Sequence, residues 1–119
     1  MSFSNFLVVV KDLQKREWKV QKEFVYYSAE KQQRIVVKPG YETNFSSIPK
    51  LLWKLIGLPG EICAEASVIY DYICTNLTFR FTKREADEIF REAMGELEVG
   101  YIRRNLMYAA VRIGGRGNW

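Results

Sequence analysis

The sequence predicts an α+β fold, in which a small N-terminal antiparallel sheet is followed by about four helices. Short β-branched or alternating runs occupy residues 5–38, the turn pair Pro39-Gly40 follows them, and the apolar period becomes helical after Ser47. At 119 residues with 48% hydrophobic content, the chain suits one compact domain spanning residues 1–119.

About three strands account for residues 5–38. Residues 6–10 are an apolar run rich in valine, residues 18–26 alternate imperfectly between apolar and polar side chains, and residues 34–38 form the third run. The polar connections between these runs favour antiparallel hairpins.

The remaining chain predicts four helices from its apolar spacing. They are residues 48–56, 61–75, 83–97 and 101–113. Ser47 is a suitable N-cap for the first helix, and Thr82 with Glu85 forms the capping-box pattern at the start of the third. Gly114 ends the last helix.

Two of these helices carry informative apolar faces. The second is apolar or small on nearly every side, which is typical of a helix buried in the centre of a domain. The last helix places four apolar residues at helical spacing, so this face is expected to pack against the core. These residues are Ile102, Leu106, Ala109 and Ile113.

Composition removes several kinds of chemistry. The chain has no histidine, which excludes Ser-His-Asp and Cys-His catalysis, and two cysteines without histidine cannot complete a four-ligand zinc site. We therefore expect no metal and no other cofactor. Cys63 and Cys74 would lie roughly 16 Å apart along one helix, so they are expected to be free thiols. The longest apolar run, residues 6–10, is far shorter than a membrane span, and a soluble chain is expected.

Charge is divided into three blocks. Residues 11–38 carry eight basic residues against four acids, residues 85–98 carry six acids and only Arg91, and residues 99–119 carry four arginines and no acid. These blocks suit complementary patches, either between neighbouring copies or on one folded surface. No nucleic-acid-binding motif accompanies the basic residues, so nucleic acid is not expected as a partner.

Asp71 is the polar residue that most needs an explanation. It lies on the apolar second helix, where an unpaired carboxylate would be strongly unfavourable. Residues 43–47 offer hydroxyl and backbone N–H donors, and Arg84 offers a positive charge. We therefore predict a polar network around this acid. Its members are Asn44, Ser46, Ser47, Asp71 and Arg84.

Four segments in order carry a resemblance to a known family. They are VVKPGYETNFSSIPKLLW, AEASVIYDYI, TKREADEIFREAM and RRNLMYAAVRIGG, and together they cover roughly residues 16–115. On these segments the chain resembles the domain-of-unknown-function 1353 family, small proteins common in bacteriophages and prophages. The resemblance implies a phage setting and brings no established activity with it.

Two positions depart from the family pattern. Asn44 stands where the family has an aspartate, and Tyr70 stands where it has the histidine before Asp-Tyr. The intact family constellation resembles one that holds a metal or performs acid/base hydrolysis, and equally resembles a structural polar network. An amide with a phenol in place of the aspartate and histidine would weaken metal binding and proton transfer. In the enzyme alternative, a metal-dependent or acid/base hydrolase of cell wall or a similar substrate would use Asp71, Ser47 and Asp87.

The last helix also carries a polar stripe. Arg104, Tyr108 and Arg112 recur at i, i+4 and i+8, a composition favoured at protein interfaces. Trp119 either lies free or inserts into a neighbouring molecule. These four residues form the predicted interface.

The preferred interpretation is a phage-encoded, non-enzymatic structural or interaction protein of the virion tail, baseplate or neck, with a decayed polar site. Its expected partners are other phage structural proteins or further copies of itself. It is expected in the host cytoplasm during assembly and then in the virion. The alternatives are the hydrolase and a host-interaction protein that inhibits a bacterial defence.

Overall fold

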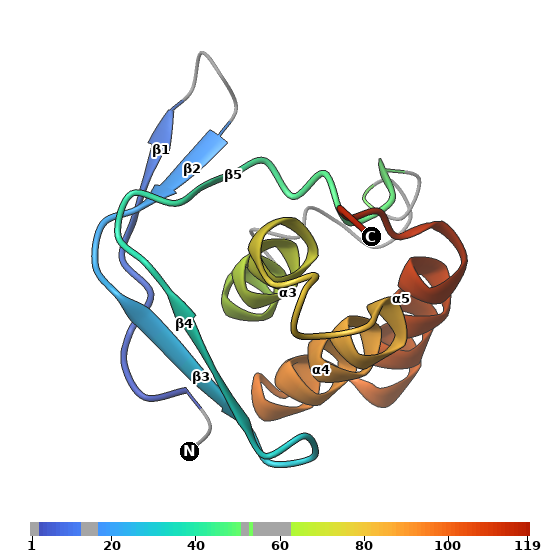
Figure 1. Ribbon diagram of the computed structural model, residues 1–119. Coiled ribbons are helices and arrows are strands. Elements are labelled where there is room, and N and C mark those ends of the chain that lie inside the picture. Colours follow the sequence, from blue (N-terminus) through green and yellow to red (C-terminus); the bar gives the residue numbers. More distant parts are fainter. Residues whose placement is uncertain (1–2, 13–16, 51–52, 54–62) are drawn as a thin grey trace.

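The computed structural model describes residues 3–12, 17–50, 53 and 63–119, and these residues contain five strands and three helices (Figure 1). The elements are β1 Val9–Asp12, β2 Glu17–Val20, β3 Phe24–Ser28, β4 Gln33–Val37, β5 Glu42–Thr43, α3 Ala64–Asn76, α4 Lys83–Glu96 and α5 Tyr101–Gly114. Antiparallel strands precede the helices, which confirms the predicted α+β class.

The strands form two small sheets where one was predicted. One sheet has the order β1-β2-β5, and the other is the β3-β4 hairpin. The predicted strand 18–26 is divided between β2 and β3. The break falls at the three polar residues 21–23, which are exposed and give the chain no apolar side chain to bury at that point. Val20 and Phe24 on either side of the break are both buried.

The helix count differs from the expected number of about four, because the described residues contain three. The expected helix 48–56 falls mostly outside the described residues. The expected helices 61–75, 83–97 and 101–113 correspond to α3, α4 and α5. The capping box of α4 is present, since the Thr82 side chain accepts from the Glu85 N–H and the Glu85 side chain accepts from the Thr82 N–H. None of the described helices is long and apolar enough to cross a membrane.

Helix α3 lies at the centre of the molecule, with the strands on one side and α4 and α5 on the other (Figure 1). It packs against α4, β4 and β5. Residues 66–74 are all buried, which confirms that the helix predicted to be apolar on nearly every side is central. Both cysteines are free and buried, as expected.

A glycine turn directs the chain toward α3 after β4. Gly40 has φ of 91°, a left-handed conformation that glycine adopts without steric penalty. The Tyr41 N–H bonds to the Lys38 oxygen at 3.3 Å across this turn. Strand β5 then pairs with β2 through Trp18 and Thr43, which places the following loop beside α3.

The prediction of which face of α5 points into the core is wrong. Ile102, Leu106 and Ile113 are 74%, 55% and 90% exposed, and Ala109 is exposed as well. Met107 and Val111 are the buried residues of this helix. Met107 and Val111 join the hydrophobic core, and Arg112 on the same helix pairs with the buried Asp87 of α4, so the helix presents this side to the protein.

Candidate functional site

Asp71 lies on the side of α3 that meets the chain around β5. The residue is 3% exposed. One carboxylate oxygen accepts hydrogen bonds from the Thr43 hydroxyl at 2.5 Å and the Tyr41 hydroxyl at 2.8 Å, and the other accepts from the Ser47 N–H at 3.3 Å. Hydrogen bonds of this kind replace the water that a buried carboxylate loses. Three neutral donors therefore hold this acid.

A tight turn after β5 brings the Ser47 N–H to Asp71. Phe45 has φ of 60°, which for a residue with a side chain costs about 1 kcal/mol or more. Its N–H bonds to the Thr43 hydroxyl oxygen at 3.0 Å, and its buried ring meets Trp18 edge-on with the ring centroids 5.5 Å apart. The strained turn is thus held by a hydrogen bond and by aromatic packing.

The five residues of the predicted polar network do not all meet. Ser47 contacts Asp71 through its backbone N–H. Asn44 and Ser46 are exposed, and the Ser46 N–H bonds to the Asn44 side-chain oxygen at 3.0 Å. Arg84 is exposed, and no hydrogen bond or ion pair of the described residues joins it to Asp71. The structure therefore joins one of the four proposed partners to this acid directly.

A second buried carboxylate, Asp87 on α4, makes the ionic contacts. It is fully buried, and one of its oxygens lies 2.9 Å from Lys83 Nζ and 2.9 Å from an Arg112 guanidinium nitrogen. The other oxygen accepts from the Tyr70 hydroxyl at 2.6 Å. Lys83 also donates to the Val111 carbonyl at 2.6 Å, near the C-terminal end of α5 where a cation is favoured. Asp87 therefore ties α3, α4 and α5 together.

Tyr70 and Cys74 link the two carboxylates. The Cys74 thiol lies near the side chains of Tyr70, whose hydroxyl bonds to Asp87, and Ser47, whose N–H bonds to Asp71. Burial raises the pKa of Cys74 to about 12 and raises the pKa of Tyr70 above its ordinary value. Burial, followed by the nearby Asp71 charge, also raises the pKa of Tyr41. All three groups stay protonated near neutral pH, so they hydrogen-bond without acting as bases.

The segment after α5 covers this linked network. The Asn118 N–H bonds to the Cys74 carbonyl at 2.8 Å. A Cβ atom at Gly115 would lie 2.6 Å from the Tyr70 hydroxyl oxygen, so the chain passes here only because this residue has no side chain. The segment therefore encloses the polar groups beneath it.

The residues of the catalytic alternative occupy structural positions. Ser47 is 3% exposed, and its side chain meets the protonated Cys74 thiol. Asp71 has hydrogen-bond donors on both oxygens, and Asp87 is paired with two cations. In this geometry all three side chains hold neighbouring elements together.

The predicted interface residues turn toward their own chain. Arg112 pairs with the buried acid of α4, and the Tyr108 ring lies 4.1 Å from the guanidinium carbon of Arg91. Arg104 lies between α5 and α4, and Trp119 donates its indole N–H to the Phe81 carbonyl at 2.8 Å. The polar stripe of α5 therefore faces α4, and the apolar stripe faces solvent.

Tyr41 and Lys83, which contact the buried acids, were absent from the sequence prediction, although each has a sequence signal. Tyr41 and Thr43 are two residues apart in an extended segment, which places them on one face. Lys83 and Asp87 stand at i and i+4, a spacing that suits an ion pair on a helix. Both signals are common, so neither singles out these residues.

Within the part of the chain that the structure describes, no group of three or more cysteine, aspartate or glutamate residues is placed to hold a metal ion. These features define a small α+β protein whose polar side chains bridge its buried elements.

The comparison with family models then identifies the family. The model described as protein of unknown function, DUF1353, matches residues 18–111, and the chain belongs to this family. The resemblance found in the sequence is thereby confirmed. No curated protein and no solved structure matches the chain.

Proposed function

We propose that this chain is a phage-encoded, non-enzymatic interaction protein, and that an exposed apolar face of α5 binds its partner. We call this surface the α5 apolar face. It consists of Ile102, Leu106, Ala109 and Ile113. These residues recur every three or four positions, so they form one continuous stripe, whereas apolar residues on most protein surfaces are scattered. This stripe is the observation that carries the proposal.

The acidic block of the chain is largely engaged within its own fold. Asp87 pairs with two cations, Glu88 lies 2.8 Å from Lys31, and Glu92 accepts from the Tyr26 hydroxyl at 2.7 Å. These three acids are therefore engaged within the chain's own fold and do not form a free acidic surface for a second copy.

The α5 apolar face has a basic margin. Arg103 and Arg116 are exposed, and residues 99–119 contain no acid. Two copies meeting through this face would bring like charges together, which opposes association. We therefore assign the face to a different protein, one that presents an apolar groove with an acidic margin.

The enclosed polar groups support the non-enzymatic part of the proposal. Asp71 and Asp87 are buried, and Tyr70, where the family has a histidine, bridges to Asp87. A catalytic residue must reach its substrate, and these side chains are occupied by contacts within the fold.

The virion part of the proposal rests on the phage setting of the family resemblance. We place the protein in the tail, baseplate or neck, where small proteins join larger structural subunits. The partner is then another phage structural protein, and a bacterial defence protein bound by the same face is the alternative.

Quantitative mass spectrometry of purified particles from a phage that encodes this chain tests the virion assignment. A fixed number of copies per particle is expected. Absence from the particles would contradict this assignment, and the host-directed alternative would then account for the α5 apolar face.

A further inference from the structure

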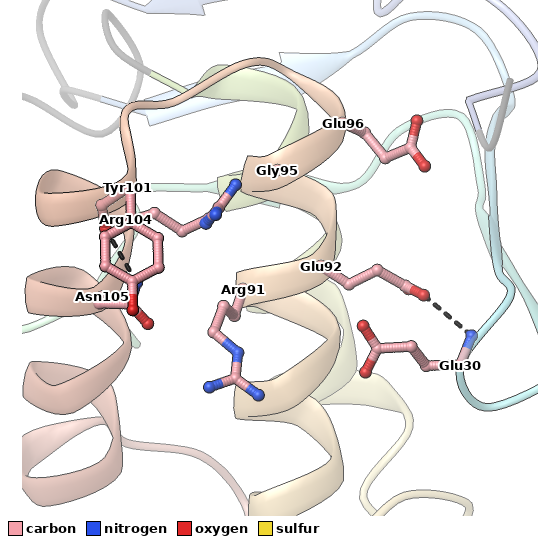
Figure 2. A pocket seen from close by; sticks show the side chains of 8 residues that line it. All are labelled: Glu30, Arg91, Glu92, Gly95, Glu96, Tyr101, Arg104 and Asn105. Atoms are coloured by element: carbon pink, nitrogen blue, oxygen red, sulfur yellow. Dashed lines mark hydrogen bonds between the residues drawn. The ribbon is translucent and has the colours of Figure 1, made fainter.

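A trough with two oppositely charged walls crosses α4 beside α5 (Figure 2). Its volume is about 550 Å³, enough for a peptide of a few residues. Arg91 and Arg104 lie on the α5 side of α4, and Glu30, Glu92 and Glu96 lie on the side of the β3-β4 turn. Neither the buried carboxylates nor the α5 apolar face includes these residues.

The basic wall is held by aromatic contacts. The guanidinium carbon of Arg91 is 4.1 Å from the Tyr108 ring centroid, and that of Arg104 is 5.8 Å from the Tyr101 centroid. Such contacts hold a guanidinium in place and leave its N–H groups free to bind an anion. Among the ion pairs that the described residues form, none includes either arginine.

Gly95 provides the space for Arg104. A Cβ atom at this position would lie 3.0 Å from a guanidinium nitrogen of Arg104, which is tighter than ordinary van der Waals contact. The missing side chain thus lets the guanidinium lie directly against α4. The site is therefore shaped by both helices.

Hydrogen bonds also hold part of the acidic wall in place. The Glu92 carboxylate accepts from the Tyr26 hydroxyl at 2.7 Å and from the Glu30 N–H at 2.9 Å. These contacts fix one carboxylate and anchor the backbone that carries the exposed Glu30 side chain. Three carboxylates against two guanidiniums leave the trough with a net negative charge, which disfavours a phosphate or another compact dianion.

A ligand that complements these two walls carries one negative and one positive charge, separated from each other. We propose that the trough binds a peptide segment with one acidic and one basic side chain. The acidic side chain pairs with Arg91 and Arg104, and the basic one lies toward Glu30. This inference rests on the proposed function, because the segment belongs to the protein held by the neighbouring α5 apolar face.

An NMR titration with N-acetyl-Glu-Gly-Lys-amide tests the proposal without the natural partner. The Gly95 amide signal and the Arg91 and Arg104 Nε–H signals of the ¹⁵N-labelled chain should shift in a saturable way. Because exposed ion pairs contribute up to about 1 kcal/mol, replacing the peptide's glutamate by glutamine should weaken binding about fivefold. The chain variant Arg104→Gln should abolish this preference, and Glu30→Gln should abolish the corresponding preference for the peptide's lysine.

Arg34→Gln is the matched control, since this exposed arginine lies on β4 outside the trough. It should bind both peptides as the unmodified chain does. Equal affinity for the glutamate and glutamine peptides, no saturable shift at Gly95, or tighter binding of inorganic phosphate would overturn the proposal.

The two proposals fail separately. Ile113→Ser should leave peptide binding unchanged, because Ile113 does not line the trough. If the peptide does not bind but the copy number per particle still depends on the α5 apolar face, only the trough assignment is removed. If the peptide binds but the copy number does not depend on that face, the proposed function is removed and the trough assignment remains.

Discussion

At the scale of single residues, the two buried carboxylates are stabilised in different ways. Asp71 is held by three neutral donors, and Asp87 by two cations and a phenol. The sequence indicated the first of these acids and its contact with Ser47. It did not indicate that Lys83, and not Arg84, pairs with a buried acid. The two residues are adjacent and point about 100° apart around the helix, so only one of them can face inward.

Replacing Asp71 tests whether its hydrogen bonds hold the fold. In Asp71→Asn an amide NH₂ replaces an acceptor and meets the hydroxyls of Thr43 and Tyr41, so the free energy of unfolding should fall by about 2 kcal/mol. Urea denaturation measures the change. Ser46→Ala, on an exposed residue of the same turn, should change it by less than about 0.5 kcal/mol. An unchanged stability in Asp71→Asn would contradict the structural role.

At the scale of elements, local signals and tertiary contacts differ in how well the sequence shows them. The start of α4 could be predicted because the capping box lies within four consecutive residues. The bounds of α5 could also be predicted from local signals, the apolar spacing and Gly114. The side of α5 that faces the core could not be predicted from them. Helical spacing shows which residues share a face, whereas the inward face was selected by Met107, Val111 and the pairing of Arg112 with α4.

The capping box gives a prediction for α4. Thr82→Ala removes the acceptor of the Glu85 N–H, so the free energy of unfolding should fall by about 1 kcal/mol. Thr82→Ser keeps the hydroxyl and should retain most of the stability. Thermal denaturation of both variants checks this expectation. A loss in Thr82→Ser as large as in Thr82→Ala would show that the methyl group matters instead of the cap.

At the scale of the whole molecule, burial of protonated groups makes stability depend on pH. The pKa values of Tyr41, Tyr70 and Cys74 are raised in the folded chain. Above roughly pH 9 these groups lose protons in the unfolded chain and keep them in the folded chain, so the unfolded state binds fewer protons. Stability is then fully present below this pH and falls as the pH rises.

Urea denaturation between about pH 8 and 11 should therefore show a falling free energy of unfolding. The steepest contribution of one group is about 1.4 kcal/mol per pH unit. Tyr41→Phe should reduce the slope, because phenylalanine has no proton to lose. If Tyr41→Phe leaves the pH dependence of the free energy of unfolding unchanged, the raised pKa of Tyr41 does not contribute to it.

The molecule thus buries two carboxylates, Asp71 and Asp87, and exposes an apolar stripe on α5. The polar groups that a catalytic reading would use join α3 to its neighbours, and the α5 apolar face has no partner among the described residues that removes it from solvent. We propose that this face, and not the buried carboxylates, carries the function.

The most direct test is to restore a phage that lacks this gene with variants of the chain and to count copies per purified particle. The double variant Ile102→Ser with Ile113→Ser should fold normally, because both side chains are exposed, and should be depleted at least about tenfold. Phe79→Ser, on an 82% exposed residue outside α5, should assemble at the normal copy number. Incorporation of the double variant at the normal copy number would contradict the proposed role of the α5 apolar face.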